Sequence, residues 1–408
     1  MRVTAEKQTL LTLFVLFIFA QGSLLADGFR NLPEGASAIG AFGGHRAFAD
    51  DANATIHNSA NLVDLEQPMV QINTVVGYGQ NKFQAVGFAD KTDNPWFLIP
   101  GFSVAAPLQD GKYAIGFATY VPFGRSVDWG DDGFFANNNI SYAGSMTVFD
   151  FTPNVAMRLT DSLSIGVGAD IYYGEVEQKT MFTGLTAAFL GLPSGTKSTL
   201  TGDGTALGWN AALTWKMTDR QRLSATYRSP FTIKYTGDNE YSIGGTRFLE
   251  RDVSAKIEYP TIVGLAYGVE FTDTLRAELD FEWLEFSQYK NLVINEGGGS
   301  TTIPQKLKDT WTIGVGGEWD FATNWTARTG FMYLRNPTPN DTYGPLGPDD
   351  NQAVISFGLG YENEKHAVDI GYAAGLFDGR SISGSVNSPD GHYDYLIHVV
   401  SLSYGYKF

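Results

Sequence analysis

The last nine residues alternate between apolar and polar or small side chains, and this pattern constrains the fold more than any other feature. In an extended strand, successive side chains point to opposite faces. One face carries Val400, Leu402, Tyr404, Tyr406 and Phe408, and the other carries two serines, a glycine and a lysine. An exposed edge with so aromatic a face would aggregate in water. A closed barrel in lipid removes the edge and gives that face an apolar solvent, so the pattern predicts a transmembrane β-barrel.

The N-terminus has the three parts of a secretory signal peptide. Arg2 and Lys7 provide the charged start, residues 10–20 are an apolar run, and Ala26 is a small residue at the exit. The apolar run is too short to span a bilayer as a helix, which needs roughly 20 residues. We therefore expect residues 1–26 to be a signal peptide, the alternative being an uncleaved anchor.

Composition excludes several classes of protein. The sequence contains no other long apolar stretch, so membrane-spanning helices are excluded. The net charge of -16 argues against nucleic acid as a partner. Acidic pairs at 131–132 and 349–350 fall in expected loops, where they either solvate the loop or bind divalent cations.

Fourteen segments of alternating hydrophobicity follow residue 66, separated alternately by short and long connectors. An even number of strands lets an antiparallel barrel close with both chain ends on one side. The short connectors, such as Gln109-Asp110-Gly111, contain turn residues. The predicted strands are 67–78, 96–107, 112–124, 140–158, 163–177, 204–217, 222–234, 253–270, 275–294, 309–321, 325–334, 352–363, 366–377 and 394–408.

The alternation also predicts which side chains line the lumen. In strand 275–294, Leu275, Leu279 and Trp283 share one face, whereas Glu278 and Asp280 share the other. A basic residue facing lipid at mid-membrane costs roughly 2–4 kcal/mol, so the charged faces point inward. The lumen is then either a hydrated porin channel or a paired network that braces a plug. The expected lumenal charges are Asp170, Arg228, Arg276, Glu278, Asp280, Glu282, Glu318, Arg328 and Asp369.

A segment of forty residues, 27–66, precedes the first predicted strand, and a simple porin needs no such segment. It is rich in glycine, alanine and serine, a composition that suits a compact plug. Its most specific motif contains Asp50, Asp51, Asn58 and Ala60. This motif resembles the hatch of the FadL-type outer-membrane transporters of long-chain fatty acids and other hydrophobic compounds. Ser59 departs from that family, which has a proline at this position, so the turn lacks the fixed backbone angle of proline.

Further matches to the family run along the whole barrel in the same order. They include residues 153–159, 163–168, 208–211, 223–229, 308–316 and 324–331. The resemblance implies a bacterial outer-membrane protein with a fourteen-stranded barrel (67–408) and an N-terminal hatch (27–66). It also implies passive uptake of a hydrophobic ligand by loop capture, binding in a lumenal pocket and release through an opening in the barrel wall.

Each of these implied steps has candidate residues. For capture, Phe182, Leu185, Phe189 and Leu192 recur at helical spacing in the long connector 178–203, and this apolar stripe either binds ligand or packs against a neighbouring loop. For the pocket, the family's N-terminal aromatic residue corresponds to Phe29, which is either a displaceable plug or part of a frayed terminus.

A carboxylate ligand would need a cation in the pocket, and a hydrocarbon would not. The lumenal phase of the alternation makes Arg158, Arg228 and Arg328 candidates for this cation. For release, Pro122 and Gly124 predict a break in the third strand, because proline cannot donate a ladder hydrogen bond. The alternatives are that Pro122 ends the strand at its extracellular side, or that the kink lies nearer Gly116.

Two other functions remain as alternatives. A hydrophilic porin would leave the forty-residue segment unexplained. A lipid hydrolase would need a nucleophile beside a histidine, and none of His45, His57, His366, His392 and His398 forms such a pattern or a metal-ligand spacing. We therefore expect a monomeric transporter without enzymatic activity, metal or cofactor. Its expected partners are outer-membrane lipid, lipopolysaccharide and, through the strand ending at Phe408, the barrel-assembly machinery.

Overall fold

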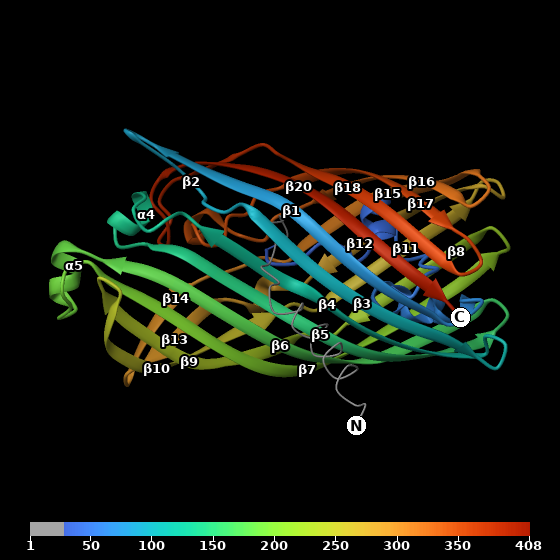
Figure 1. The fold of residues 1–408 in the computed structure, drawn as a ribbon, viewed down its shortest axis with the longest axis horizontal. Helices are drawn as coiled ribbons and strands as arrows, with labels where there is room; N and C mark the ends of the chain where they lie inside the picture. The colour runs from blue at the N-terminus through green and yellow to red at the C-terminus, as the bar shows by residue number, and fades with distance from the viewer. Residues whose placement is uncertain (1–27) are drawn as a thin grey trace, which may run out of the picture.

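Residues 28–408 are described by a computed structural model. The predicted signal peptide, residues 1–26, and Asp27 lie outside the described residues. Twenty strand segments form one antiparallel sheet that closes into a barrel of fourteen wall strands (Figure 1). The predicted fold class, an antiparallel barrel of fourteen strands, is therefore confirmed.

Ten wall strands are continuous along their length. They are β1 (Met69–Ala85), β3 (Trp96–Leu108), β4 (Tyr113–Asp128), β5 (Ser141–Thr160), β6 (Leu163–Phe182), β7 (Thr196–Thr218), β16 (Trp325–Leu334), β17 (Gln352–Glu362), β18 (His366–Phe377) and β20 (Gly391–Lys407). Two short strands, β2 (Phe88–Lys91) and β19 (Arg380–Ile382), extend the sheet beside β1 and β20.

The other four wall strands are each built from two segments. They are β8 (Gln221–Arg228) with β9 (Phe231–Ile243), β10 (Thr246–Tyr259) with β11 (Ile262–Glu270), β12 (Leu275–Leu284) with β13 (Asn291–Glu296), and β14 (Gly299–Pro304) with β15 (Thr310–Ala322). Two of the interruptions contain Pro230 and Pro260, which cannot donate a ladder hydrogen bond. The alternation predicts three of these four strands as unbroken, so the interruptions differ from the prediction.

The wall strands also reach further at the end that carries the long connectors. For example, β1 ends at Ala85 rather than at residue 78, and β7 begins at Thr196 rather than at residue 204. Beyond the apolar band both faces of a hairpin contact water, so the hydrophobic alternation fades although the backbone pairing continues. The sequence therefore marks the membrane-spanning part of each strand better than its full length.

The C-terminal strand closes the barrel. β20 pairs with β1 from Met69 opposite Lys407 to Gln84 opposite His392, and with β18 on its other edge. Val400, Leu402 and Tyr404 are exposed on the outside of the barrel. Every wall strand pairs with a neighbour on each side over at least part of its length, so the sheet closes around the full circumference of the barrel.

The inside and outside of the wall differ as the alternation predicts. Leu275 and Leu279 of β12 are exposed on the outside, whereas Glu278, Asp280 and Glu282 are buried on the inside. An inward position removes these charges from lipid, where they would be costly.

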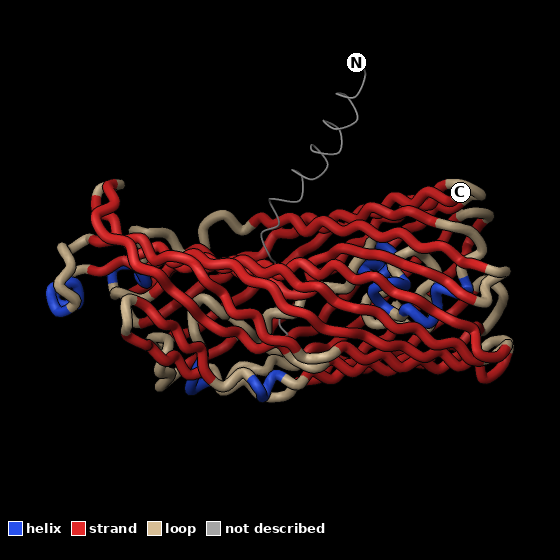
Figure 2. The backbone as a smooth tube through the Cα atoms, turned by 90° about the horizontal axis from the view of Figure 1, so that it is seen from below, coloured by secondary structure: helices blue, strands red, loops and turns tan. Residues whose placement is uncertain are grey.

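Residues 28–66, hereafter the N-terminal segment, lie inside the barrel (Figure 2). The segment contains α2 (Ala36–Gly40), α3 (Ala54–His57) and the 3-10 helix η2 (Ser59–Asp64). The remaining helices lie in the half of the barrel that carries the long connectors: α4 (Phe134–Asn137), α5 (Gly184–Phe189), η3 (Phe286–Gln288) and η4 (Asn340–Thr342). No helix among residues 28–408 is long and apolar enough to cross a membrane.

Charges on the barrel wall hold the N-terminal segment. The Glu278 carboxylate accepts hydrogen bonds from the backbone N–H groups of Arg46, Ala47 and Phe48 at 2.6, 2.6 and 3.0 Å. Arg276 forms an ion pair of 2.7 Å with Asp50. Of the two expectations for the lumenal charges, the structure shows the paired network rather than an open hydrated channel.

Small residues in the wall let the N-terminal segment approach closely. A side-chain carbon added at Gly166 of β6 would lie 2.5 Å from the carbonyl carbon of Ser59 and 2.6 Å from the nitrogen of Ala60. Gly317 of β15 has no such close neighbour, since a side-chain carbon added there would meet only the backbone oxygen of Arg276, at 3.8 Å.

We expect Gly166→Ala to displace the N-terminal segment from the wall, since overpacking of this kind costs roughly 1–3 kcal/mol. The measurement is hydrogen exchange at the amides of residues 58–62, which should be faster in the variant. Gly317→Ala is the matched control and should exchange like the wild type. Equal protection in all three proteins would contradict this account of the contact.

Candidate functional site

A mostly apolar cavity lies in the half of the barrel that carries the long connectors. Its volume is about 340 Å³, and we call it the outer cavity. Its walls come from β4, β5, β6, β7, β9, β10, β13 and β14 and from the connector at 338–347. The apolar side chains that face it include Phe29, Met146, Ile257, Leu292, Leu307 and Leu346.

Arg125 of β4 is the one basic side chain among the described residues that line the outer cavity. Within residues 28–408 its guanidinium forms no ion pair and no hydrogen bond. The acidic side chain that lines the same cavity, Glu177, is instead paired with Lys179 at 2.7 Å. An unpaired cation in an apolar cavity favours a ligand with an anionic head group.

Asp349 is a carboxyl group that acts electrostatically on Arg125. It accepts a hydrogen bond from the Thr338 hydroxyl at 2.7 Å, and burial raises its pKa to about 7. Near neutral pH a large share of Asp349 is therefore protonated and does not neutralise Arg125.

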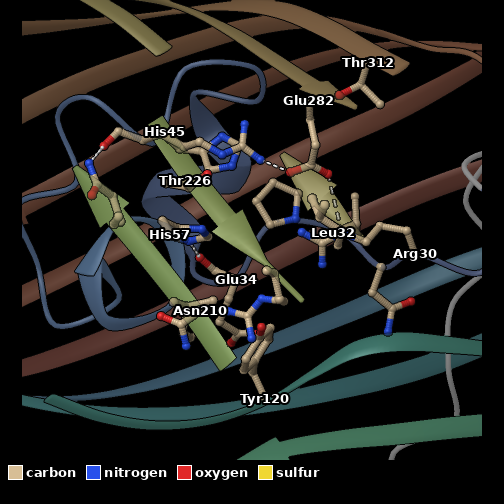
Figure 3. Close-up of a pocket in the computed structure, with 18 of the residues that line it drawn as sticks. Arg30, Leu32, Glu34, His45, His57, Tyr120, Asn210, Thr226, Glu282 and Thr312 are labelled. Atoms are coloured by element: carbon tan, nitrogen blue, oxygen red, sulfur yellow. Dashed lines mark hydrogen bonds and ion pairs between the residues drawn. The ribbon is translucent and has the colours of Figure 1, made fainter. Parts of the chain in front are cut away.

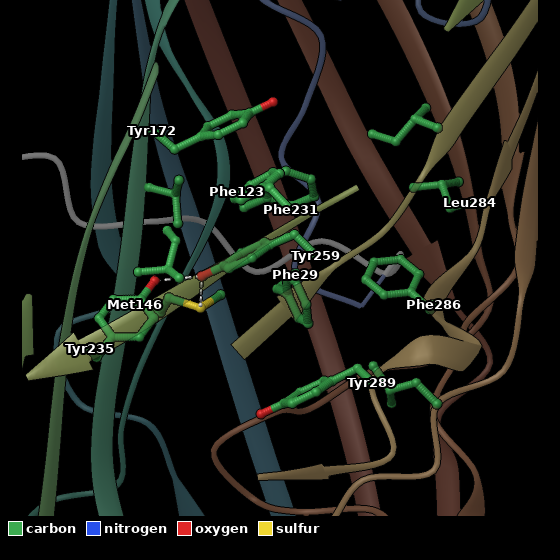
Figure 4. Packing of buried hydrophobic residues seen from close by; sticks show 14 residues of the cluster. Phe29, Phe123, Met146, Tyr172, Phe231, Tyr235, Tyr259, Leu284, Phe286 and Tyr289 are labelled. Carbon is green, nitrogen blue, oxygen red and sulfur yellow. Dashed lines mark hydrogen bonds between the residues drawn. The ribbon is translucent and has the colours of Figure 1, made fainter. Parts of the chain in front are cut away.

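Aromatic side chains form the floor of the outer cavity, with Phe29 at their centre (Figure 4). The Phe29 ring lies 5.1 Å from Phe286 and 5.4 Å from Tyr259, both edge to face. Tyr259 stacks on Phe231 with 4.4 Å between ring centres. Phe29 is 4% exposed, so this part of the N-terminal segment is packed rather than frayed.

The wall beside this floor is interrupted between β3 and β4. The two strands pair only from Phe102 opposite Thr119 to Leu108 opposite Tyr113. Beyond Thr119, β4 keeps its pairing with β5 but shifts register between Tyr120 and Phe123, which is a β-bulge. From Tyr120 onward the edge of β4 that faced β3 has no wall strand beside it.

The N-terminal segment takes the place of the missing strand on that edge. Arg30 forms an antiparallel bridge with Phe123. The Asn31 N–H donates to the Pro122 carbonyl at 2.9 Å, and the Gly124 N–H donates to the Phe29 carbonyl at 3.0 Å. The interrupted edge is thus satisfied from inside the barrel.

A second, polar cavity of about 80 Å³ lies on the other side of this contact, and we call it the inner cavity (Figure 3). Its basic side chains are already paired. Arg228 contacts Asp150 at 2.6 Å and Asp170 at 2.8 Å, while Arg46 pairs with Asp280 and Glu282. The inner cavity therefore offers an anionic ligand no uncompensated cation comparable to Arg125.

Burial shifts the pKa values of two groups in the inner cavity. Burial raises the pKa of Glu34 to about 8, although a hydrogen bond with Asn73 opposes the shift. Burial lowers the pKa of His57 to about 4, and its ring nitrogen contacts the Glu34 carbonyl at 2.7 Å. The Glu34 carboxyl occupies the space beside Gly101 of β3, next to the point where β3 and β4 part.

The structure places the three predicted carboxylate partners in ion pairs outside the outer cavity. Arg158 contacts Asp64 at 2.9 Å, and Arg328 contacts Glu318 at 2.7 Å and Asp369 at 2.6 Å. Arg228 lines the inner cavity and is paired as described above. The alternation correctly places all three arginines on the inside of the wall, but acidic side chains that also point inward neutralise them.

The predicted wall residues lie in different parts of β4. Pro122 lies within the bulge and Gly124 just beyond it, and the strand continues to Asp128, so Pro122 does not end the strand. Gly116 is regularly paired with Ala105 and Asn154, so the kink does not lie there.

The predicted capture residues lie on and beside α5, which projects at the end with the long connectors (Figure 1). Leu185 is 89% and Phe189 is 91% exposed, whereas Phe182 and Leu192 are partly buried. The exposed half of the stripe does not pack against a neighbouring loop.

The motif at 50–60 lies where the N-terminal segment meets the wall. Asp51 accepts hydrogen bonds from the Asn53 N–H at 2.8 Å and from Gln71 at 3.1 Å, and Asp50 pairs with Arg276. The Asn58 amide donates to the Arg46 carbonyl at 2.9 Å and to the Thr214 hydroxyl at 2.8 Å. Ala60 is fully buried. The hydroxyl of Ser59, which stands at the family's proline position, is buried without a hydrogen-bond partner.

Sequence reasoning missed Arg125 because the bulge reverses the alternation. Before the bulge the even residues of β4, such as Ala114 and Ala118, are buried and the odd ones face outward. After it the odd residues Phe123 and Val127 are buried. If the alternation before the bulge is extended along the strand, Arg125 is placed on the outer face, in lipid. Pro122 was the available signal, because proline in a sheet often marks a bulge.

Comparison with known proteins decides the family. Residues 18–408 match the family described as "Outer membrane protein transport protein (OMPP1/FadL/TodX)". The chain belongs to this family. It is accordingly an integral outer-membrane β-barrel, as the sequence predicted.

Several relatives share most of the chain. A long-chain fatty acid transport protein of Escherichia coli O6:H1 is 23% identical over 84% of this chain and 85% of its own length. The fold is close to that of a Pseudomonas aeruginosa FadL homologue, with a TM-score of 0.83, 21% identity and coverage of 93% of this chain and 100% of that one. The Pseudomonas putida toluene transporter TodX has a TM-score of 0.76 at 16% identity, with 94% and 100% covered.

The pKa shift of Glu34 predicts that the N-terminal segment is held less firmly at alkaline pH. A raised pKa means that the folded chain holds a proton that the unfolded chain releases. Its contribution to stability is therefore complete below about pH 4.5 and is lost as the pH rises to about 8. Burial lowers the pKa of His57 to about 4 and raises the pKa of Asp51 to about 6, so both groups titrate below pH 6.5.

Leak conductance in planar bilayers tests this prediction. In the wild type it should increase between pH 6.5 and 8.5, and in Glu34→Gln it should stay constant. Glu66→Gln, an exposed position in the same segment, is the control and should behave as wild type. An increase of equal size in Glu34→Gln would assign the pH dependence to another group.

Proposed function

We propose that the protein takes up long-chain fatty acids, or other single-chain amphiphiles with a carboxylate, across the outer membrane. The observation that carries this proposal is the unpaired guanidinium of Arg125 in the apolar outer cavity. The apolar walls suit an acyl chain, and the guanidinium suits a carboxylate, which it can bind through two parallel hydrogen bonds. The cavity volume of about 340 Å³ lies within the usual range for ligand pockets, roughly 300–1,000 Å³.

Fatty acids fit this cavity better than hydrocarbons do. Both classes occur among the names of similar proteins, since the E. coli relative is a long-chain fatty acid transport protein and TodX is a toluene transporter. A hydrocarbon would leave Arg125 without a counter-charge, and burying an uncompensated charge is unfavourable. Binding of a carboxylate removes that cost.

Capture from outside would begin at α5. Leu185 and Phe189 present an apolar surface at the outermost part of the protein, and exposed apolar surface of this kind commonly marks a binding site. A captured acyl chain would then pass to the outer cavity, which opens among the same group of connectors.

Release would require movement of the N-terminal segment. Phe29 separates the outer cavity from the inner one, and Arg30 and Asn31 cover the interrupted edge of β4. Withdrawal of residues 29–31 would remove the floor of the outer cavity and uncover the gap between β3 and β4 together. The ligand would then leave sideways through the wall, and the polar network would keep the rest of the plug in place.

Other functions fit less well. A hydrophilic porin needs an open lumen, whereas ion pairs hold the N-terminal segment inside this one. The family is one of transporters, and no group of three or more metal-ligating side chains occurs within residues 28–408. Transport by passive binding and release requires no cofactor.

Replacement of Arg125 tests the substrate class. A charge-assisted hydrogen bond contributes about 1.5–3 kcal/mol, so Arg125→Gln should weaken oleate binding by about 10–150-fold. Binding of a hydrocarbon of similar length, such as octadecane, should be unchanged or tighter. The measurement is displacement of a fluorescent fatty acid from the purified protein.

Arg247→Gln is the control, since this guanidinium is exposed and already paired with Glu240 and Glu250. Oleate affinity that falls equally in both variants would point to general electrostatics. Unchanged affinity in Arg125→Gln would remove the carboxylate site from the proposal.

A reversible tether tests the role of the N-terminal segment. The sequence has no cysteine, so Arg30→Cys with Phe123→Cys creates one possible disulfide. The two residues are an antiparallel pair, flanked by hydrogen bonds between their neighbours, for which the Cα atoms lie about 4.5 Å apart. That spacing is suitable for a disulfide.

Uptake of labelled oleate by cells that lack their own transporter should stop when the tether is oxidised and return on reduction. The reduced double variant and the two single variants control for the lost side chains. Uptake that is equal before and after reduction would show that release does not need movement at this contact.

A further inference from the structure

A row of outward-facing residues, all but one of them aromatic, marks one boundary of the apolar band. Tyr227, Val263, Trp283 and Trp311 lie directly opposite one another on neighbouring wall strands. Trp209 contacts Tyr227 with 4.7 Å between ring centres, and Tyr333 contacts Trp311 at 5.8 Å. Such girdles mark the membrane interface in outer-membrane barrels.

The spacing to the opposite girdle supports this assignment. Trp319 lies eight residues further along β15 than Trp311 and is exposed near the end with the short turns. Eight residues correspond to about 27 Å along the strand, and to roughly 20 Å across the membrane at the usual strand tilt. The band between the two rows therefore matches the apolar part of a bilayer, and the first row faces the outer leaflet.

Five basic side chains lie beyond the outer row, one on each of five neighbouring wall strands; along the strand two of them are two or three residues from the row, and the other three are seven residues from it. They are Lys234 on β9, Lys256 on β10, Lys290 before β13, Lys308 before β15 and Arg335 after β16. All five are exposed. Within residues 28–408 none of the five side chains forms an ion pair or a hydrogen bond.

Two of these side chains form an unfavourable pair. Lys234 and Lys256 are directly opposite each other on β9 and β10. Their inward neighbours Ile233 and Ile257 face the interior, so both lysines point outward. Like charges directly opposite each other destabilise a sheet. An anion bound between them would turn the repulsion into attraction.

Acidic residues nearby do not neutralise the row. Glu258 lies two residues from Lys256 and has no ion pair, Glu285 accepts from the Thr261 hydroxyl, and Asp309 accepts from the Ser287 N–H. Asp203 lies opposite Thr236, diagonal to Lys234. Two acidic pairs on β9 and β10 lie further from the membrane than the lysine pair: Asp238 opposite Asp252 by four residues, and Glu240 opposite Glu250 by six. Five unpaired basic groups thus lie on the outer-leaflet side of the aromatic row, in a protein with a net charge of -16.

We infer that this row, hereafter the basic row, binds the phosphate groups of lipopolysaccharide in the outer leaflet. Lysine and arginine are the usual ligands of phosphate, and basic clusters at a membrane interface recognise anionic lipid head groups. The five neighbouring strands span roughly 20 Å at 4.8 Å per strand, which accommodates a diphosphorylated glycolipid head. The inference rests on the outer-membrane location and is independent of the transported substrate.

Binding of purified lipopolysaccharide to the protein in lipid nanodiscs tests the inference. Lys234→Gln with Lys256→Gln should weaken binding at least about tenfold, since each basic residue near an anionic surface contributes about 1 kcal/mol. Lys234→Arg with Lys256→Arg should keep wild-type affinity. The matched control is Arg247→Gln with Arg251→Gln, on the same hairpin, whose guanidiniums are already paired with Glu240, Glu250 and Glu296.

Dephosphorylated lipopolysaccharide distinguishes phosphate recognition from contact with acyl chains. The wild-type protein should bind this lipid no more tightly than the glutamine variant binds it. Inorganic phosphate at millimolar concentration should not compete, because the basic row is spread over five strands. Equal affinity of the glutamine variant and the wild type would overturn the inference. So would equal affinity for dephosphorylated lipopolysaccharide, or displacement by inorganic phosphate.

Discussion

The integrity of the barrel wall depends on hydrogen bonds to the edge of β4 that β3 leaves unpaired. Inside a membrane, an unpaired backbone N–H or C=O costs several kcal/mol, so a transmembrane barrel normally pairs every strand on both sides. Beyond Thr119, β4 has lost β3 as its neighbour. Residues 29–31 replace β3 with two backbone hydrogen bonds and an antiparallel bridge. The N-terminal segment is therefore part of the wall as well as the filling of the lumen.

This double role links two events that a transporter must coordinate. Phe29 forms the centre of the aromatic floor, and the next residue, Arg30, bridges β4. A ligand that enters the outer cavity and displaces Phe29 would also strain the contacts at Arg30 and Asn31. Meanwhile Glu278, Arg276 and Arg158 hold the later part of the segment through separate contacts. In the proposed route, local withdrawal thus opens the wall without expelling the whole plug.

The regular parts of the molecule could be predicted from the sequence, and the irregular parts could not. Period-2 alternation identified the fourteen wall strands, and the cost of charge in lipid placed Glu278 and Arg328 in the lumen. Alternation could not reveal that Arg328 is neutralised, because its partners Glu318 and Asp369 come from other strands. It also failed at Arg125, where the bulge reverses the phase of β4. The interruptions of β8–β15 and the hairpin extensions were missed because the alternation ends or changes there while the backbone pairing continues.

A crystal structure of the protein with a fatty acid brominated at its terminal carbon tests the central claim most directly. The account predicts a carboxylate within hydrogen-bond distance of the Arg125 guanidinium, about 2.7–2.9 Å, and an anomalous bromine peak within the outer cavity. A carboxylate bound in the inner cavity beside Arg228, or a bromine peak outside both cavities, would contradict it.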